Sequence, residues 1–156
     1  MIEIYTDGSF LRINQNEKNG FGHGGWAFCV MEGVQVLYSK TGGESGNDFA
    51  NGKMELVAVF QAILYSQNQS CKIHSDSSYI VNGFNDWKDG WLRSDFKKGK
   101  IKFAKIWREA FDLWNADTQK IAWVKSHIGV VGNEKADGLA LKAAEEERLR
   151  WQKQFN

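Results

Sequence analysis

The segment NGKMELVAVFQAIL (Asn51–Leu64) decides the fold, because it predicts a helix that connects two groups of strands. Good helix-forming residues dominate the segment, and neither glycine nor proline interrupts it after Gly52. Its side chains are apolar almost all round, so we expect the helix to be mostly buried. Beyond the first three residues, only Glu55 and Gln61 are polar.

The carboxylate of Glu55 has two explanations in this setting. A buried carboxylate either takes up a proton or needs a charged or hydrogen-bonding partner, which would make Glu55 part of a site. Alternatively, an acid in the first turn suits the helix dipole and still reaches water, which would make Glu55 an ordinary helix-start residue. The helix alone leaves both explanations open.

Strands are predicted on both sides of this helix. Residues 2–7 (IEIYTD) alternate and should form a strand that ends at Asp7, followed by a polar, glycine-rich loop over residues 11–25. Residues 26–31 and 34–42 flank a two-residue turn at Glu32-Gly33, which predicts a hairpin. After the helix, which should end near Asn68, two further strands are predicted at residues 71–76 and 119–126.

Three more helical segments complete the pattern. A short helix is expected within residues 77–87, an amphipathic helix within 101–115, and a closing helix from Glu134 onwards after the loop HIGVVGN. A strand–helix–strand connection implies parallel neighbours, while the hairpin supplies antiparallel ones. The sequence therefore predicts an α/β protein with a mixed sheet and helices packed on it, in one domain over residues 1–156.

Composition excludes several classes of protein. Hydrophobic residues make up 42% of the chain and charged residues 25%, as in ordinary soluble proteins, and no segment is apolar and long enough to span a membrane. No signal peptide is expected, because charges interrupt the N-terminal segment. Cys29 and Cys71 lack metal-ligand spacing, which favours a reducing compartment without disulfides. We therefore expect a cytoplasmic monomer with no membrane partner and no disulfide partner.

The glycines at residues 20–25 (GFGHGG) fit the dinucleotide-binding pattern G-x-G-x-x-G literally. That motif requires a preceding strand and a following helix N-terminus, so that backbone amides meet a pyrophosphate. Here a polar loop precedes the glycines and a predicted strand follows them. A flexible loop is the better interpretation.

Two aspartates end strands that should be parallel neighbours. Asp7 and Asp76 would then lie at the same carboxyl edge of the sheet, about 5 Å apart by strand spacing. Open α/β sheets place their sites at this edge. For each aspartate alone, a role as a turn residue or a helix N-cap is the better explanation.

A further acid, Asp137, shares a helix face with Ala140, Leu141 and Ala144, although it could also be a first-turn acid favoured by the dipole. Two carboxylates about 4 Å apart repel by roughly 4 kcal/mol at an effective dielectric of about 20. A site that gathers Glu55 and the three aspartates must therefore protonate or bind cations. Oxygen-only ligands favour Mg²⁺ or Mn²⁺, and paired divalent ions suit displacement at phosphorus.

Positive charge is concentrated in residues 91–108 (WLRSDFKKGKIKFAKIWR), which we name the basic segment. It carries seven bases and one acid, a local charge of +6 in a chain whose net charge is only +1. A solvated charged face is one interpretation. The interleaved Trp91 and Phe96 and the polarised charge favour contact with nucleic-acid phosphates. The bases are Arg93, Lys97, Lys98, Lys100, Lys102, Lys105 and Arg108.

The motifs IYTDGS, NGKMEL, IHSDSSYIVNGFNDW and WVKSHIGVVGNEKADGLA resemble, in order and context, those of type 1 ribonuclease H. The resemblance spans nearly the whole chain, from Ile2 to about Ala144. It implies a ribonuclease H-like fold: a five-stranded mixed sheet, with three antiparallel and two parallel strands, flanked by helices on both faces. Residues 1–144 would form the catalytic core and residues 145–156 a C-terminal helical extension.

The resemblance also implies an activity, hydrolysis of the RNA strand of RNA–DNA hybrids to 5′-phosphate and 3′-hydroxyl ends. One bound metal ion would activate water and a second would stabilise the leaving oxygen, with two Mg²⁺ expected and Mn²⁺ as a substitute. His127 would assist proton transfer and product release from a loop in which Gly129 and Gly132 allow movement. Carried over by position, the metal-binding catalytic acids are Asp7, Glu55, Asp76 and Asp137.

Substrate contacts follow from the same resemblance. Gly8, Ser9, Asn51 and Gly52 would touch the RNA strand near the cut, and 2′-hydroxyls are what distinguish RNA from DNA. Ala50 and Gly52 stand where the family commonly has polar residues, which removes side-chain contacts, and the loop after Asp7 is longer than usual. The further expected substrate-binding residues are Ser78, Trp91, Arg93, Lys97, Lys98 and Lys100.

Three other functions are compatible with parts of this pattern. The chain could be another nuclease of the same fold, such as a resolvase or a transposase-like enzyme, or a catalytically silent hybrid-binding module. It could also be a structural protein with a cation-stabilised acidic cluster. The combined MEL, SDS and histidine-loop motifs argue against the first, and the presence of all four acids argues against the second.

Overall fold

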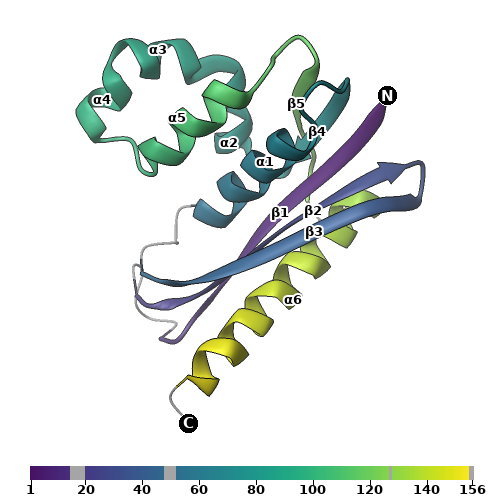
Figure 1. The fold of residues 1–156 in the computed structure, drawn as a ribbon, viewed down its shortest axis with the longest axis vertical. Coiled ribbons are helices and arrows are strands. Elements are labelled where there is room, and N and C mark those ends of the chain that lie inside the picture. Colours follow the sequence, from purple (N-terminus) through teal and green to yellow (C-terminus); the bar gives the residue numbers. More distant parts are fainter. Residues whose placement is uncertain (15–19, 48–51, 127, 155–156) are drawn as a thin grey trace.

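The computed structural model describes residues 1–14, 20–47, 52–126 and 128–154. Its elements follow one another in the expected order of three strands, helix, strand, helices, strand and helix (Figure 1). The strands and helices are β1 (Ile2–Arg12), β2 (Gly22–Glu32), β3 (Gln35–Gly46), α1 (Lys53–Tyr65), β4 (Cys71–Ser75), α2 (Ser78–Asn82), the π-helix η1 (Gly83–Trp87), α3 (Lys88–Arg93), α4 (Asp95–Gly99), α5 (Ala104–Leu113), β5 (Gln119–Trp123) and α6 (Val131–Lys153).

Within the described residues the strands form one five-stranded sheet in the order β3-β2-β1-β4-β5. The pairs β1–β2 and β2–β3 are antiparallel, whereas β1–β4 and β4–β5 are parallel. The crossover through α1 places β4 beside β1, as the strand–helix–strand pattern predicts. The expected mixed sheet is confirmed.

Helices cover both faces of this sheet (Figure 1). One face carries α1 and α5, and its core includes Ile4 and Phe28 from the strands with Leu56 from α1 and Trp107 from α5. The other face carries α6, where Ala136 packs on Cys29 and Met31 of β2. Alternation of side chains along each strand explains how one strand serves two cores. Both cysteines are buried and free.

The predicted ends of several elements are wrong by a few residues. The turn of the first hairpin lies at residues 33–34, α1 ends at Tyr65, and α6 begins at Val131. Asp137 therefore lies in the second turn of α6, and it is not the first-turn acid that the sequence allowed. Among the described helices, none is long and apolar enough to cross a membrane.

The larger correction concerns the first two strands. β1 does not end at Asp7 but runs on to Arg12, paired with the glycine-rich segment that was expected to be a loop. Gly25 lies in β2 beneath α6, where an added Cβ atom would come within 2.3 Å of the Ala140 carbonyl oxygen. Gly22–Gly25 therefore belongs to a strand whose glycines allow close helix packing.

Candidate active site

The carboxylates of Asp7, Glu55 and Asp76 converge at one point, although they come from β1, α1 and the end of β4. One ligand atom from each residue lies within 4.8 Å of the others. The parallel register, in which Tyr5 pairs with His74, carries Asp7 alongside Asp76 when it is continued. Asp7 reaches the sheet edge because β4 ends there, while β1 continues with β2 alone as its partner.

Asp7 is the most enclosed of these acids, with only 5% of its surface exposed. Burial raises the pKa of Asp7 from 3.8 to about 9, and the charge of Asp76, a hydrogen bond with Asp137 and the charge of Glu55 act in the same direction. The backbone N–H of Gly8 donates to the carboxylate and opposes this rise. The site therefore disfavours negative charge on Asp7 unless a cation compensates for it.

Glu55 lies in the first turn of α1 and is half-buried. Burial raises the pKa of Glu55 from 4.5 to about 7, the charge of Asp76 adds to the rise, and a hydrogen bond with the Ser77 side chain lowers it. Glu55 therefore lies in the first turn of the helix and also belongs to the acidic site, so the two explanations offered by the sequence do not exclude each other. The helix begins after Gly52, whose φ of 87° lies in the left-handed region that favours glycine.

The backbone around Asp76 is held by two hydrogen bonds. The Trp123 indole donates from Nε1 to the Asp76 carbonyl oxygen at 3.3 Å. The Thr6 hydroxyl donates to the His74 carbonyl oxygen at 2.9 Å, which joins β1 and β4 just before both aspartates. The sequence analysis did not identify Thr6, Ser77 and Trp123 as supporting residues. The only signal in the sequence was their position within or next to the motifs, which does not reveal these hydrogen bonds.

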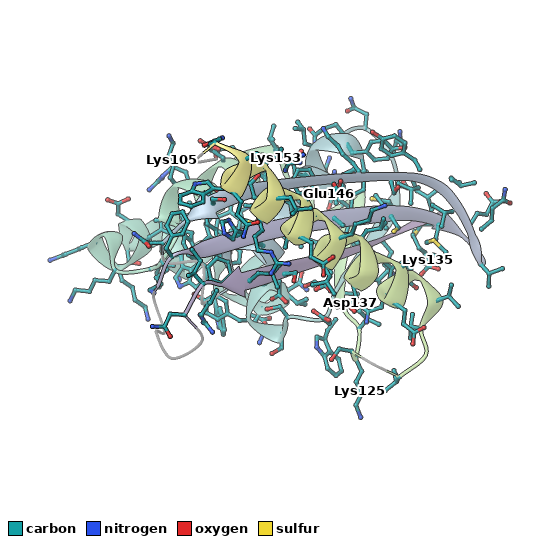
Figure 2. The ribbon with its side chains drawn as sticks, turned by 90° about the horizontal axis from the view of Figure 1, so that it is seen from below. Lys105, Lys125, Lys135, Asp137, Glu146 and Lys153 are labelled. Atoms are coloured by element: carbon teal, nitrogen blue, oxygen red, sulfur yellow. The ribbon has the colours of Figure 1, made fainter. Side chains whose placement is uncertain are left out.

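Asp137 approaches the cluster from the opposite face of the sheet, in the first half of α6 (Figure 2). Its carboxyl group hydrogen-bonds Asp7, although Asp137 itself is exposed and lies outside the group of three acids. One turn earlier on the same helix, Asn133 is 3% exposed, and its Oδ1 has no hydrogen-bond partner in the part of the chain that the structure describes. The sequence analysis did not identify Asn133.

The donor set fits a hard divalent cation. Asp7, Glu55 and Asp76 offer carboxylate oxygens only, and no sulfur or imidazole belongs to this group among the residues that were placed. Carboxylate oxygens are the ligands that Mg²⁺ and Mn²⁺ prefer. The raised pKa values of Asp7 and Glu55 show that the acids need a compensating positive charge to ionise together near neutral pH.

Several expected contact residues surround these acids. Gly8 packs against α1, where an added Cβ atom would come within 2.4 Å of the Glu55 backbone nitrogen. Ser9 is half-buried in β1, and Ser78 is exposed at the start of α2. His127 and Asn51 lie outside the residues that the structure describes.

The basic segment forms the end of α3, all of α4 and the start of α5, at the end of the molecule away from the C-terminus (Figure 1). Arg93, Lys97, Lys98 and Lys100 are all exposed, as phosphate contact requires. The backbone from Asp95 to Lys98 is left-handed, with φ between 49° and 57°, which is unusual for residues other than glycine.

Trp91 corrects one expectation for the basic segment. Its side chain is only 6% exposed and packs with its ring centroid 5.0 Å from that of Trp107, while Phe96 is 1% exposed. Both aromatic residues therefore belong to the core beneath the segment, because the left-handed turn directs Phe96 inward. The aromatic rings that reach solvent nearby belong to Tyr79 and Trp87.

Two neighbouring clefts lie along the basic segment, and one of them reaches Glu55. A cleft of about 540 Å³ is lined by Gly52, Glu55 and Ser77 on one side and by Lys100 and Lys102 on the other. A neighbouring cleft of about 750 Å³ has a mixed lining of aromatic, basic and acidic side chains, which are those of Tyr79, Trp87, Trp91, Arg93, Lys97, Asp86 and Asp89. An extended anionic ligand could therefore contact the acids and the lysines together.

Comparison with known proteins agrees with this geometry. The RNase H family model matches residues 1–145. Ribonuclease HI from Campylobacter jejuni is 37% identical over 145 residues, covering 92% of this chain and 90% of its own. Ribonuclease H from Pseudomonas putida is 32% identical over 155 residues, covering 96% and 97%.

A solved structure shows the same relationship. The crystal structure of LC9-RNase H1, a type 1 RNase H with the type 2 active-site motif, aligns with a TM-score of 0.71 at 26% identity, covering 94% of this chain and 72% of that one. The chain therefore belongs to the RNase H family, a family of RNA–DNA hybrid endoribonucleases.

Proposed function

We propose that this protein hydrolyses the RNA strand of RNA–DNA hybrids at the cluster of Asp7, Glu55 and Asp76, leaving 5′-phosphate and 3′-hydroxyl ends. The observation that carries the proposal is the convergence of three carboxylates within 4.8 Å, in a chain that the RNase H family model matches. Three acids held this close oppose folding unless protons or cations neutralise them. The presence of three acids in one place, despite this cost, is therefore best explained by a functional role.

Asp7, Glu55 and Asp76 would hold the metal ions, and Asp137 would contribute from α6 through its contact with Asp7. When two Mg²⁺ or Mn²⁺ ions are bound, they would supply activation of the attacking water and stabilisation of the leaving oxygen. The protein fixes this arrangement with Ser77 on Glu55 and Trp123 on the backbone of Asp76. His127 would transfer a proton near the leaving oxygen, since an imidazole titrates close to neutral pH.

The hybrid would lie across the clefts between the acids and the basic segment. The RNA strand would contact the backbone at Gly8, Ser9 and Gly52 together with Asn51, beside the acids that cut it. The DNA strand would extend to the exposed Arg93, Lys97, Lys98 and Lys100, and the exposed Ser78 would be a further contact. Trp91 would support this surface from beneath, because it is buried.

The arrangement is that of a single catalytic unit, with residues 1–144 as its core and the remainder of α6 as an extension. All the described acids of the cluster lie in the core part, and the cleft next to them is lined by core residues alone. We propose that the protein acts as a monomer, since each proposed role is assigned to this chain.

A substrate panel tests the proposal directly. The protein is incubated with a labelled RNA–DNA hybrid, with and without Mg²⁺, beside RNA duplex, DNA duplex and branched DNA. We expect metal-dependent cleavage of the RNA strand of the hybrid alone, with 5′-phosphate ends on the products. Cleavage of branched or duplex DNA would indicate a resolvase-like nuclease. Hybrid binding without cleavage in Mg²⁺ or Mn²⁺ would indicate a silent binding module.

A further inference from the structure

A partly buried hydrogen-bonded network joins β2, β3 and the C-terminal extension of α6. His23, which is 1% exposed, lies directly opposite Ser45 in the β2–β3 pair, with 2.7 Å between His23 Nδ1 and Ser45 Oγ. The Ser45 hydroxyl donates to Glu147 Oε2 at 2.6 Å, and Arg150 donates to the other oxygen, Oε1, at 2.9 Å. Because the serine proton is used on Glu147, Nδ1 of His23 must be the donor to Ser45.

Aromatic side chains pack around the His23 end of this network. The ring centroid of Trp151 lies 5.6 Å from that of His23 and 4.8 Å from that of Phe21. Burial lowers the pKa of His23, the charge of Glu147 opposes this change, and the charge of Arg148 adds to it. Specific hydrogen bonds and ring contacts therefore hold these residues in place, and none of them has a role in the proposed chemistry.

Ser45 and its neighbour Glu44 connect the two faces of the sheet. Successive side chains of a strand point to opposite faces, so Ser45 turns towards α6 while Glu44 turns towards α1. Glu44 Oε2 accepts from Lys53 Nζ at 3.1 Å, and Lys53 is the first residue of α1. On one face of the sheet the end of β3 is therefore hydrogen-bonded to Glu147. On the other face an ion pair joins it to α1, the helix that carries Glu55.

A second contact links the same strands to α1. Gly24 pairs with Glu44 in the sheet, and an added Cβ atom on Gly24 would come within 2.7 Å of the Met54 side chain. Met54 is next to Glu55. A shift of the β2–β3 end would therefore displace the first turn of α1, both through the Glu44–Lys53 ion pair and through packing on Met54.

The RNase H family model ends at residue 145, before Glu147 and Trp151. We propose that Glu147, acting through Ser45 and His23, is a positioning residue that holds the β3 end and thereby sets the place of Gly52 and Glu55 at the start of α1. The C-terminal extension is then a part of the catalytic apparatus that the family model does not include. This inference rests on the proposed hydrolysis of hybrids.

The test compares Ser45→Ala and Glu147→Gln with the wild type and with Glu146→Gln. Glu146 is exposed on the same helix (Figure 2), so its substitution makes the same change in charge and size without touching the network. We measure kcat and KM on a labelled hybrid, the Mg²⁺ concentration for half-maximal rate, and the melting temperature with and without Mn²⁺. All assays are run well below the melting temperature of every variant.

We expect Ser45→Ala and Glu147→Gln to lower kcat/KM about three- to tenfold, the range that corresponds to one or two ordinary hydrogen bonds. Half-maximal rate should require more Mg²⁺, and Mn²⁺ should raise the melting temperature less than it does in the wild type. Ser45→Thr, which keeps the hydroxyl group, should restore all three values.

Other results would overturn the inference. If Ser45→Ala and Glu147→Gln melt at lower temperatures but match Glu146→Gln in kcat, KM and metal requirement, the network only stabilises the fold. If Ser45→Ala fails to fold, Glu147→Gln decides by the same comparison, because it leaves the packing of the extension in place. If the wild type and Glu146→Gln both fail to cleave the hybrid, the proposed function itself is wrong, and the inference fails with it.

Discussion

The carboxyl groups of Asp7 and Asp137 share a hydrogen bond, although the two residues come from opposite ends of the chain and from a strand and a helix. Two ionised carboxylates can only accept hydrogen bonds, so this contact requires a proton on one of them. Because the pKa of Asp7 is raised to about 9, its carboxyl group carries that proton at neutral pH. A bound divalent cation would replace it, so protons and metal ions should compete for this site.

Stability in the absence of metal should therefore fall as the pH rises. Asp7 and Glu55 have pKa values near 9 and near 7 in the folded protein, against 3.8 and 4.5 as ordinary values. The folded state then binds more protons than the unfolded state between about pH 4 and about pH 9, and over that range each increase in pH favours unfolding. Thermal melting in EDTA at pH 5, 7 and 9 measures the effect.

Mg²⁺ or Mn²⁺ should reverse this trend, because a cation that binds the folded state stabilises it by mass action. The rise in melting temperature on adding metal should be small at pH 5, where protons occupy the site, and larger at pH 8. His23 and His74 have lowered pKa values and destabilise the fold only on the acid side. A metal effect independent of pH would contradict the competition between protons and metal.

Asp7→Asn should abolish hybrid cleavage and leave the fold intact. Because the pKa of Asp7 is raised to about 9, the wild type must take up a proton at this carboxyl group when it folds at pH 7. The amide removes that requirement, so the variant should melt at a higher temperature than the wild type in EDTA at pH 7. Mn²⁺ should then raise its melting temperature less. Asp117→Asn, an exposed acid near β5, is the matched control and should change neither activity nor melting. Wild-type cleavage by Asp7→Asn would refute the assignment.

The proximity of Asp7 and Asp76 could be predicted because it depends on local patterns and one topological rule. The strand–helix–strand order makes β1 and β4 parallel neighbours, and the apolar α1 must pack on them. Asp7 and Asp76, at the predicted ends of these two strands, then lie at one edge of the sheet. The resemblance to type 1 ribonuclease H added Glu55 and Asp137, which the residue patterns alone did not place near the two aspartates.

The extent of β1 and β2 could not be predicted in the same way. Glycine weakens a strand when it is judged from local propensity, yet Gly25 lies in β2 because α6, far along the chain, packs closely on it. Phe96 was expected on the surface and is buried, because a left-handed turn directs it onto Trp91 and Phe111. Both features depend on contacts between residues distant in sequence.

Replacing Lys97, Lys98 and Lys100 together by glutamine should weaken hybrid binding and flatten its salt dependence. Each lost phosphate contact lowers the slope of log affinity against log salt by about 0.9, so a decrease of about 2 to 3 is expected. Binding is measured in the Asp7→Asn background, which should not cleave the hybrid. The control triple variant replaces the exposed Lys40, Lys142 and Lys153 and changes the net charge equally. Equal slopes for the two triple variants would exclude a phosphate-binding role for the basic segment.

Replacing glycine by alanine should have opposite effects at two positions, Gly25 in β2 beneath α6 and Gly138 on the exposed side of α6. In Gly25→Ala the new methyl group would lie 2.3 Å from backbone atoms of Ala140 and Ala144, which cannot move without shifting α6 from the sheet. We expect a loss of about 3 kcal/mol or more in the free energy of unfolding, at the upper end of the cost of overpacking. In Gly138→Ala the methyl group would meet no atom within 4 Å, so the better helix propensity of alanine should stabilise the protein by about 1 kcal/mol. Urea denaturation of the two variants in EDTA measures the difference, and similar stabilities would show that α6 does not pack on β2 as closely as the structure has it.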